Sequence, residues 1–285
     1  MYDQAEKLRD RLSKQQKQGK TIAVVSGKGG VGKSNTALNF SLELQRAGKR
    51  VLLFDLDVGM GNIDILIGND AKYTIANLFN EFIPLHDIIE LGPLDLSYVA
   101  GGTSLNEFIC LDEQKLNYFY EQYNKIVKKY DYILFDLGAG VSQGSMSFIL
   151  ASDECFVVTT PEPTALTDAY SMIKHIFLKQ SKMPISIIMN RCSNSKEGNQ
   201  LLDKFNQVIN QFLQQDIKKL GMLPNDQTVS KAVIRQTPYV IYDQYAAISR
   251  AMKQIVSNFL QQSDRVNEIK RLSFIERLKN YLTTR

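Results

Sequence analysis

The sequence predicts an α/β fold in which a single twisted, mostly parallel β-sheet is flanked by helices on both faces. Three observations support this prediction. Short apolar runs recur along the 285-residue chain, stretches with helical spacing separate them, and polar side chains follow most of the apolar runs. Continuously apolar strands that alternate with helices are typical of a parallel sheet, because helices bury both sides of each strand.

The first segments of the chain show this alternation of strand and helix. Residues 21–26 (TIAVVS) are apolar and β-branched and predict a strand. The glycine-rich stretch 27–34 comes next, and helical spacing of apolar residues then predicts a helix that ends near Gly48. Residues 49–59 (KRVLLFDLDVG) predict a buried strand that ends in carboxylates.

Later strands are expected within five apolar segments, and helices within the stretches between them. The predicted strands lie within residues 95–102, 130–140, 154–163, 184–192 and 217–226. The predicted helices span residues 113–129, 164–181, 197–214, 245–262 and 267–282. Ligands bind where the carboxyl ends of parallel strands meet. The polar residues expected at that edge are Lys28, Lys33, Asp55, Asp57, Asp136, Thr159, Thr160, Asn190, Asn225 and Asp226.

Composition and charge restrict the protein's location and partners. No run of about 18 apolar residues and no apolar leader occurs, so we expect a cytoplasmic protein. Three widely separated cysteines predict no disulfide framework. Residues 1–20 and 264–285 each carry six basic and three acidic side chains, and the other 243 residues together carry a net charge of −2. The basic tails favour acidic partners such as anionic lipid.

Residues 27–34 (GKGGVGKS) match the phosphate-loop pattern G-x-x-x-x-G-K-[ST], between a predicted strand and a predicted helix. Glycines let backbone N–H groups approach phosphate oxygens, Lys33 reaches the β- and γ-phosphates, and the Ser34 hydroxyl binds Mg²⁺. A chance match in a glycine-rich turn is the alternative. The predicted nucleotide-binding residues of this loop are Gly29, Gly30, Val31, Gly32, Lys33, Ser34 and Asn35.

Two predicted strands end in carboxylates near this loop. Asp136, followed by Gly138 and Gly140, is expected to hold Mg²⁺ through water. Asp55 and Asp57 point the same way on their strand, which favours a bound cation or a role with water. We assign Asp55 to the outer shell of the metal and Asp57 to orienting the attacking water. Solvated loop aspartates are the structural alternative.

Three motifs in order, KGGVGKS, FDLDVGMGNIDILIG and FDLGAG, give the chain a resemblance to the MinD/ParA family of deviant-Walker-A ATPases over roughly residues 21–260. The resemblance implies a P-loop NTPase fold, with two ATP molecules and Mg²⁺ bound between two protomers. It also implies that Lys28 crosses the dimer interface to the partner's phosphates, as an arginine finger would. A solvated loop lysine is the alternative.

The resemblance also implies adenine contacts and slow ATP hydrolysis to ADP and phosphate. Asn190 and the loop around Pro224 are expected to border the adenine, and no Asn-Lys-x-Asp guanine signature occurs. Asn190 as a strand-end cap is the alternative.

The C-terminal stretch predicts a basic amphipathic helix. Phe274, Ile275, Leu278, Tyr281 and Leu282 gather on one face, with basic residues at its edges. Such a helix at a chain end is typical of peripheral membrane attachment, and MinD proteins carry a similar one. The alternative is a helix packed on its own protomer. We expect residues 264–285 to target the inner face of the cell membrane.

The N-terminal segment 1–20 resembles that of the FlhG family (YlxH, FleN), MinD-like ATPases that control flagellar number and placement. The matching pattern, DQAxxLR, is formed here by Asp3, Gln4, Ala5, Leu8 and Arg9. The resemblance implies that this segment stimulates the GTPase FlhF and that the flagellar C-ring proteins FliM and FliY or FliN are partners. Residues 21–263 then form the ATPase domain.

Other functions share parts of this pattern. A MinD-type division-site ATPase has the same nucleotide motifs and differs in the N-terminal segment. A ParA-type DNA-partitioning ATPase is disfavoured by the slightly acidic central region, and an iron–sulfur carrier by the absence of Cys-x-x-Cys. A nucleotide-binding switch with negligible catalysis remains open, although Asp57 argues for hydrolysis.

Overall fold

The computed structural model describes residues 18–57, 61–102, 113–140, 142–263 and 272–283. Its centre is an eight-stranded sheet with the strand order β3-β4-β2-β5-β1-β6-β7-β8. The strands are β1 (Lys20–Val25), β2 (Val51–Leu56), β3 (Glu90–Leu91), β4 (Ser97–Val99), β5 (Tyr132–Leu137), β6 (Glu154–Thr159), β7 (Ile185–Cys192) and β8 (Lys218–Pro224). The predicted α/β fold with one mostly parallel sheet is confirmed.

All neighbouring strands pair in parallel except β3 and β4, which are antiparallel. The sequence did not predict β3, because two residues carry no periodic signal. In the parallel centre Asp55 of β2 lies opposite Asp136 of β5, so the register itself brings two of the predicted site carboxylates side by side.

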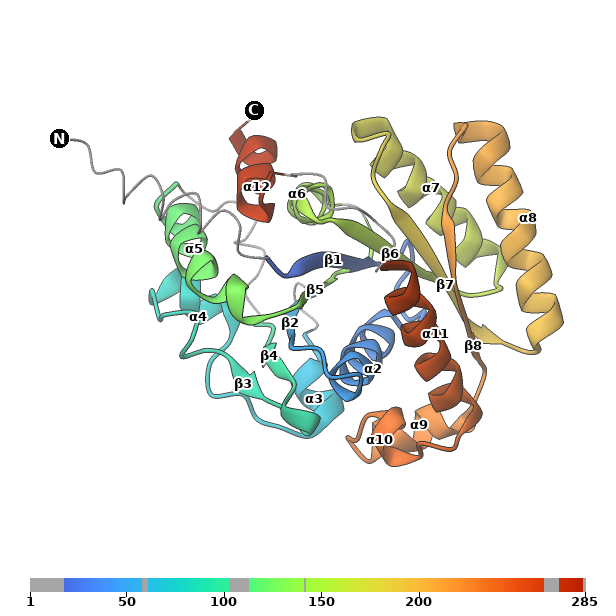
Figure 1. Ribbon diagram of the computed structural model, residues 1–285, viewed down its shortest axis with the longest axis horizontal. Helices are drawn as coiled ribbons and strands as arrows, with labels where there is room; N and C mark the ends of the chain where they lie inside the picture. The colour runs from blue at the N-terminus through green and yellow to red at the C-terminus, as the bar shows by residue number, and fades with distance from the viewer. Residues whose placement is uncertain (1–17, 58–60, 103–112, 141, 264–271, 284–285) are drawn as a thin grey trace.

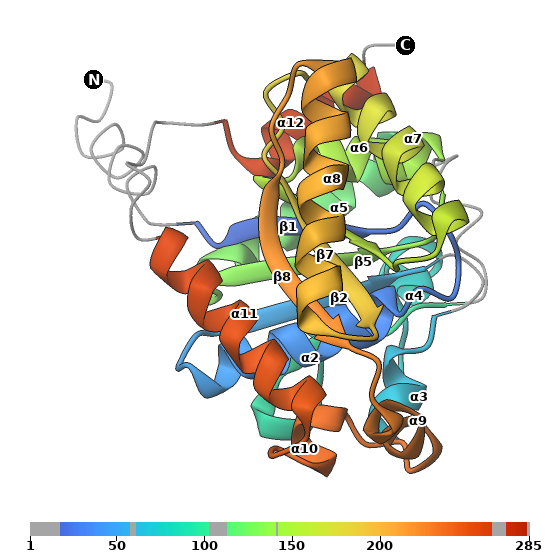
Figure 2. The same cartoon turned by 90° about the vertical axis from the view of Figure 1, so that its right-hand side faces the viewer.

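Helices cover both faces of the sheet (Figure 1). One face carries α4 (Ile75–Asn80), α5 (Glu113–Ile126), α6 (Gln143–Ala151), α7 (Pro163–Lys179), α8 (Ser195–Leu213) and α12 (Phe274–Thr283). The other face carries α2 (Lys33–Arg46), α3 (Ile63–Ile67), α9 (Gln227–Ile234), α10 (Tyr239–Tyr242) and α11 (Ala247–Ser263). Figure 2, seen from the β8 side of the sheet, shows α8 and α11 on opposite sides of β8. Each face therefore has its own apolar core.

The long predicted helices are confirmed, whereas several short ones were not predicted. Helix α6 shows why. Its sequence QGSMSFILA is buried at every position from Met146 to Ala151, so it lacks the alternation of apolar and polar faces on which helix prediction depends.

Helix α2 lies at the centre of one face and buries polar as well as apolar side chains. The hydroxyl of Ser41 donates to the carbonyl of Ala37, four residues earlier. The Asn39 amide donates to the Asn35 carbonyl and accepts the backbone N–H of Val240 in α10. Because each buried polar group has a partner, α2 is held rigidly below the phosphate loop.

The C-terminal helix α12 packs on the body of its own protomer. Phe274, Ile275 and Leu278 are at most 4% exposed, and Tyr281 and Leu282 are half-buried. The ring of Phe274 stacks on Phe135 of β5 with 4.9 Å between the ring centroids. The residues predicted to face a membrane are therefore covered by protein in this structure, as the structural alternative expected.

Helix α12 also begins later than predicted. The prediction placed its start at residue 267, but Leu272 and Ser273 are not helical, and 264–271 lie outside the described residues. The reason is a capping box: the Ser273 hydroxyl accepts the Glu276 N–H, and the Glu276 carboxylate accepts the Ser273 N–H. Across the described ranges, no helix is long and apolar enough to cross a bilayer.

We expect Phe40→Ala to lower the free energy of unfolding by about 3–5 kcal/mol, because it leaves a cavity in the core. The Phe40 ring is 1% exposed and packs edge-on against Phe156 and Phe259, at 5.2 and 5.4 Å between centroids. Urea unfolding followed by circular dichroism measures the change. Leu178→Ala, at a residue 72% exposed, is the control and should change stability by less than about 0.5 kcal/mol. Phe40 belongs to α2, so equal effects of the two variants would contradict the packing described for this helix.

Candidate nucleotide-binding site

The phosphate loop connects β1 to α2 and has the backbone shape that its glycines permit. Gly30 and Gly32 have φ angles of 76° and 90°, in the left-handed region that side chains disfavour. Gly27 packs against α7, where a Cβ atom would lie 2.3 Å from the carbonyl carbon of Asp168. The loop therefore opens at the N-terminus of α2, a position that binds anions through free backbone N–H groups.

Lys33 lies at the start of α2 with its side chain 6% exposed. Its ammonium is 2.6 Å from an Asp136 carboxylate oxygen and 3.3 Å from one of Asp57. Burial alone would lower the pKa of Lys33, but the Asp136 and Asp57 carboxylates outweigh burial and raise that pKa. Lys33 is therefore a permanent cation next to the phosphate loop.

Asp136 and Ser34 provide oxygen atoms suited to a divalent cation. Asp136 is fully buried at the end of β5, and its Oδ2 atom has no hydrogen-bond partner among the described residues. The Ser34 hydroxyl lies 3.3 Å from the Lys33 ammonium, in the same cluster. A hydroxyl and a carboxylate are ligands that Mg²⁺ prefers. The donor set and the unsatisfied carboxylate oxygen therefore fit the Mg²⁺ that the sequence predicts.

Asp55 is buried and accepts three backbone hydrogen bonds. One oxygen accepts the Asp57 N–H at 3.1 Å, and the other accepts the N–H groups of Asn62 at 2.8 Å and Ile63 at 3.1 Å. Burial raises the pKa of Asp55 to about 7, the Asp136 carboxylate adds to this rise, and the backbone donors oppose it. Asp55 thus fixes the chain between β2 and α3; its place in the outer metal shell stays a prediction.

The Lys28 side chain contacts the start of α7. Its ammonium lies 3.0 Å from the Thr164 hydroxyl and 3.4 Å from a Glu162 carboxylate oxygen. Both partners of the ion pair are exposed, with 42% of the Lys28 side chain and 58% of the Glu162 side chain accessible. Exposed pairs of this kind contribute about 0–1 kcal/mol, so Lys28 is held loosely and can be drawn to another anion.

Asn190 lies two residues before the end of β7, and Pro224 is the last residue of the neighbouring strand β8. The Asn190 amide donates to the Val31 carbonyl of the phosphate loop at 2.8 Å and accepts the N–H of Arg191. The backbone N–H of Asn225 donates to the carbonyl of Cys192. The structure therefore joins Asn190 to the phosphate loop, where its amide braces the loop backbone. Contact of Asn190 and Pro224 with adenine stays a prediction.

The structure gathers the predicted residues of the phosphate loop, Asp55, Asp57, Asp136 and Asn190 at one edge of the sheet. The predicted membrane residues, which belong to α12, pack instead against the apolar core of their own protomer. The predicted partner residues 3–9 lie outside the described ranges. Sequence reasoning missed Glu162 and Thr164, the neighbours of Lys28. Their position after the apolar run of β6 was a signal that could have identified them.

We expect Gly32→Ala to destabilise the nucleotide-free protein by about 1–2 kcal/mol, because alanine disfavours the left-handed backbone at this position. The added Cβ would also lie 2.3 Å from the Asn190 amide nitrogen and displace its hydrogen bond to the loop. Gly29→Ala is the matched control, since a Cβ there meets no atom within 4 Å. Thermal unfolding without nucleotide measures both. A Gly29→Ala variant as unstable as Gly32→Ala would show that the local geometry does not decide the effect.

Comparisons with known proteins agree with this site. A family profile described as "ParA: NUBPL iron-transfer P-loop NTPase" matches residues 17–260. The antiactivator FleN of Pseudomonas aeruginosa is 33% identical, over 75% of this chain and 77% of FleN. The flagellum site-determining protein YlxH of Helicobacter pylori is 31% identical, over 75% of this chain and 72% of YlxH.

Solved structures with the same fold include the septum site-determining protein MinD of Pyrococcus horikoshii complexed with Mg-ADP. It is 26% identical, covers 89% of this chain and 99% of its own, and has a TM-score of 0.69. The phosphate loop, the strand-end carboxylates and these relatives agree with one another. The chain belongs to the MinD/ParA family of P-loop ATPases and, within it, to the FlhG (FleN/YlxH) type.

Proposed function

We propose that this protein is an ATP-dependent dimerising switch that regulates the number and placement of flagella. In the proposed cycle ATP joins two protomers, the dimer binds the inner face of the cell membrane as a peripheral protein, and slow hydrolysis reverses both steps. The names of the FleN and YlxH relatives support the flagellar role.

The observation that carries the proposal is that two lysines of one loop have different surroundings. Lys33 is buried with Asp57 and Asp136 and serves the nucleotide of its own protomer. Lys28 is exposed and rests on the start of α7. A flexible, weakly held cation next to a phosphate site is suited to reach a second anion, here the nucleotide of the partner protomer.

Hydrolysis then uses groups already at the site. Ser34 and Asp136 would hold Mg²⁺, which when bound neutralises charge on the phosphates. The Asp57 side chain is 21% exposed and lies 3.3 Å from the Lys33 ammonium, so it can orient water near the phosphates. Backbone N–H groups of the phosphate loop and the Lys33 ammonium stabilise the charge that develops during transfer.

Membrane attachment in this proposal requires that α12 leave its docked position. The apolar face formed by Phe274, Ile275 and Leu278 is buried, so it becomes available to lipid only after release. The face is apolar and the flanking chain is basic, which suits an anionic lipid surface. The docked structure therefore corresponds to the state that does not bind membrane.

The proposed partners are FlhF, through residues 1–20, and the C-ring proteins FliM and FliY or FliN. The pattern DQAEKLR supports the first of these. Its apolar stripe of Ala5, Leu8 and Leu12 is too short to form a stable helix alone, and it suits a segment that folds on a partner.

Two other functions of the family fit less well. A division-site role like that of MinD is favoured by the MinD structure with the same fold, but the N-terminal segment distinguishes this chain. Iron carriage is disfavoured by the two described cysteines, because burial raises the pKa of both Cys155 and Cys192 and so opposes the thiolate that binds metal.

We expect Lys28→Ala to weaken ATP-dependent dimerisation at least tenfold, about 1.4 kcal/mol, while nucleotide still binds each protomer. Light scattering with a non-hydrolysable ATP analogue measures the dimer, and fluorescent-nucleotide titration measures binding. Lys182→Ala removes an equally charged exposed residue elsewhere and should dimerise normally. A Lys28→Ala protein that dimerises like wild type would rule out the role in trans.

A peptide of residues 1–20 should by itself accelerate GTP hydrolysis by FlhF, because the proposed activating contacts all lie in this segment. The expected increase is several-fold at saturating peptide, measured as phosphate release. A peptide in which Leu8 and Leu12 are replaced by Ser keeps the charge and removes the apolar stripe, so it should be inactive. An inert wild-type peptide would favour the MinD-type alternative.

A further inference from the structure

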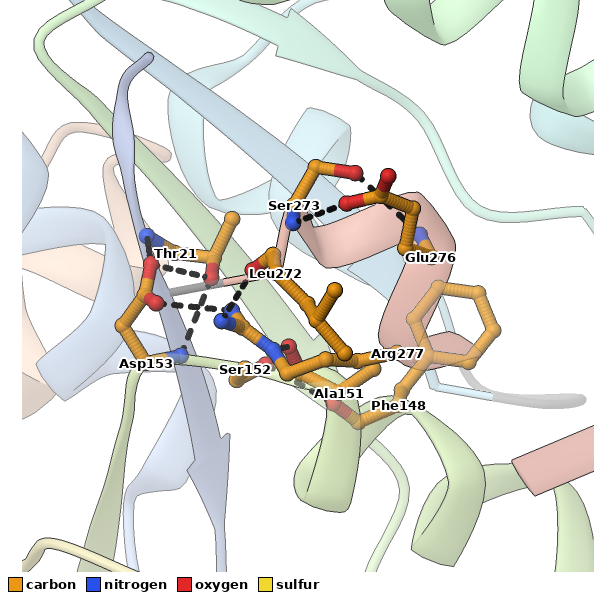
Figure 3. Close-up of polar contacts among 9 residues, drawn as sticks. All are labelled: Thr21, Phe148, Ala151, Ser152, Asp153, Leu272, Ser273, Glu276 and Arg277. Carbon is orange, nitrogen blue, oxygen red and sulfur yellow. Dashed lines mark hydrogen bonds and ion pairs between the residues drawn. The ribbon is translucent and has the colours of Figure 1, made fainter. Parts of the chain in front are cut away.

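Arg277 of α12 forms a compact set of hydrogen bonds at the base of the docked helix (Figure 3). Its Nε donates to the Ala151 carbonyl at 2.6 Å, Nη1 to the Leu272 carbonyl at 2.7 Å, and Nη2 to an Asp153 carboxylate oxygen at 2.7 Å. The side chain is only 14% exposed. Ala151 is the last residue of α6, so the guanidinium satisfies a carbonyl that the helix end leaves free.

Asp153 connects this arginine to the strand that leads into the phosphate loop. Its second oxygen accepts the backbone N–H of Thr21 at 2.9 Å and the Thr21 hydroxyl at 2.8 Å, and its own N–H donates back to that hydroxyl. Thr21 lies in β1, five residues before Ser26 and the loop. One carboxylate thus holds β1 with one oxygen and α12 with the other.

We propose that the Arg277–Asp153 pair is the latch that keeps α12 docked, with both residues acting as positioning residues. This inference rests on the proposed function, in which α12 leaves its site to bind anionic lipid. Apolar contacts such as Phe274 on Phe135 are non-directional. The arginine bonds are directional and charge-assisted, so they fix where the helix sits and must break for its release.

The latch can open without damage to the body of the protein. When Arg277 leaves, Asp153 keeps its bonds to Thr21, so the start of β1 remains paired. The guanidinium gains the phosphate groups of an anionic bilayer in exchange for the carboxylate. The Tyr123 ring packs against Phe274 of α12, and its buried hydroxyl has no hydrogen-bond partner among the described residues, which costs free energy in the packed structure.

Asp153→Asn tests the latch without changing α12. The asparagine oxygen can still accept from Thr21, while its NH₂ group faces the Arg277 guanidinium and cannot accept from it. We expect amide hydrogens of residues 274–283 in the full-length, nucleotide-free protein to exchange roughly tenfold faster or more, since a bond to a charged group is lost. Exchange in α11 should not change.

Asp131→Asn is the matched control. Asp131 precedes β5 as Asp153 precedes β6, accepts the backbone N–H of Arg50, and pairs with the Arg50 guanidinium. Arg50 does not belong to α12, and Asp131→Asn changes the net charge by the same amount as Asp153→Asn. Arg277→Lys is a second variant, which keeps the charge of α12 but lacks the planar fork, and it should also speed exchange in α12.

Vesicle co-sedimentation separates the latch from the proposed function. Wild type should pellet with phosphatidylglycerol-containing vesicles only with a non-hydrolysable ATP analogue, whereas Asp153→Asn should pellet without nucleotide; neither should pellet with pure phosphatidylcholine. If wild type never pellets, the proposed membrane role fails, while the exchange experiment still decides the latch. If exchange in α12 is the same in Asp153→Asn, Arg277→Lys and Asp131→Asn, the latch is overturned. Should Asp153→Asn fail to fold, Arg277→Lys alone decides.

Discussion

The buried ammonium of Lys33 is the interaction around which the site is organised. A charge with 6% exposure is tolerable only when opposite charge lies close to it, and Asp136 and Asp57 provide that charge. The parallel pairing of β2 with β5 brings the carboxylates at the ends of these two strands together beside Lys33. The same carboxylates suit a divalent cation, so the cluster that balances Lys33 also prepares the protein for nucleotide with Mg²⁺.

Helix α6 runs from the carboxyl end of β5 back to the amino end of β6. It begins just after Gly140, whose backbone N–H donates to the carbonyl of Ser26 beside the phosphate loop. It ends at Ala151, whose carbonyl accepts a hydrogen bond from α12. The phosphate loop and the C-terminal helix therefore lie near opposite ends of one helix.

Much of the site could be predicted because its chemistry is local in the sequence. The phosphate loop needs glycines at fixed spacing, and the residues after buried strands fall at one edge of a parallel sheet. Their position after β6 places Glu162 and Thr164 at that edge, but their pairing with Lys28 could not be predicted, since they lie more than 130 residues away along the chain. The three backbone donors to Asp55 were equally hidden, because they depend on how the chain turns back between β2 and α3.

The sequence by itself determined the fold class, the phosphate loop and the carboxylates, since periodic burial and glycine spacing are properties of short segments. Only the tertiary structure decided the position of α12. An amphipathic face is equally suited to lipid and to a protein core, so its periodicity cannot distinguish the two. The apolar bed formed by Phe135, Phe148 and Tyr123, together with the carbonyl of Ala151 and the carboxylate of Asp153, decided for the core. These groups are separated along the chain and meet only when the sheet and helices have assembled.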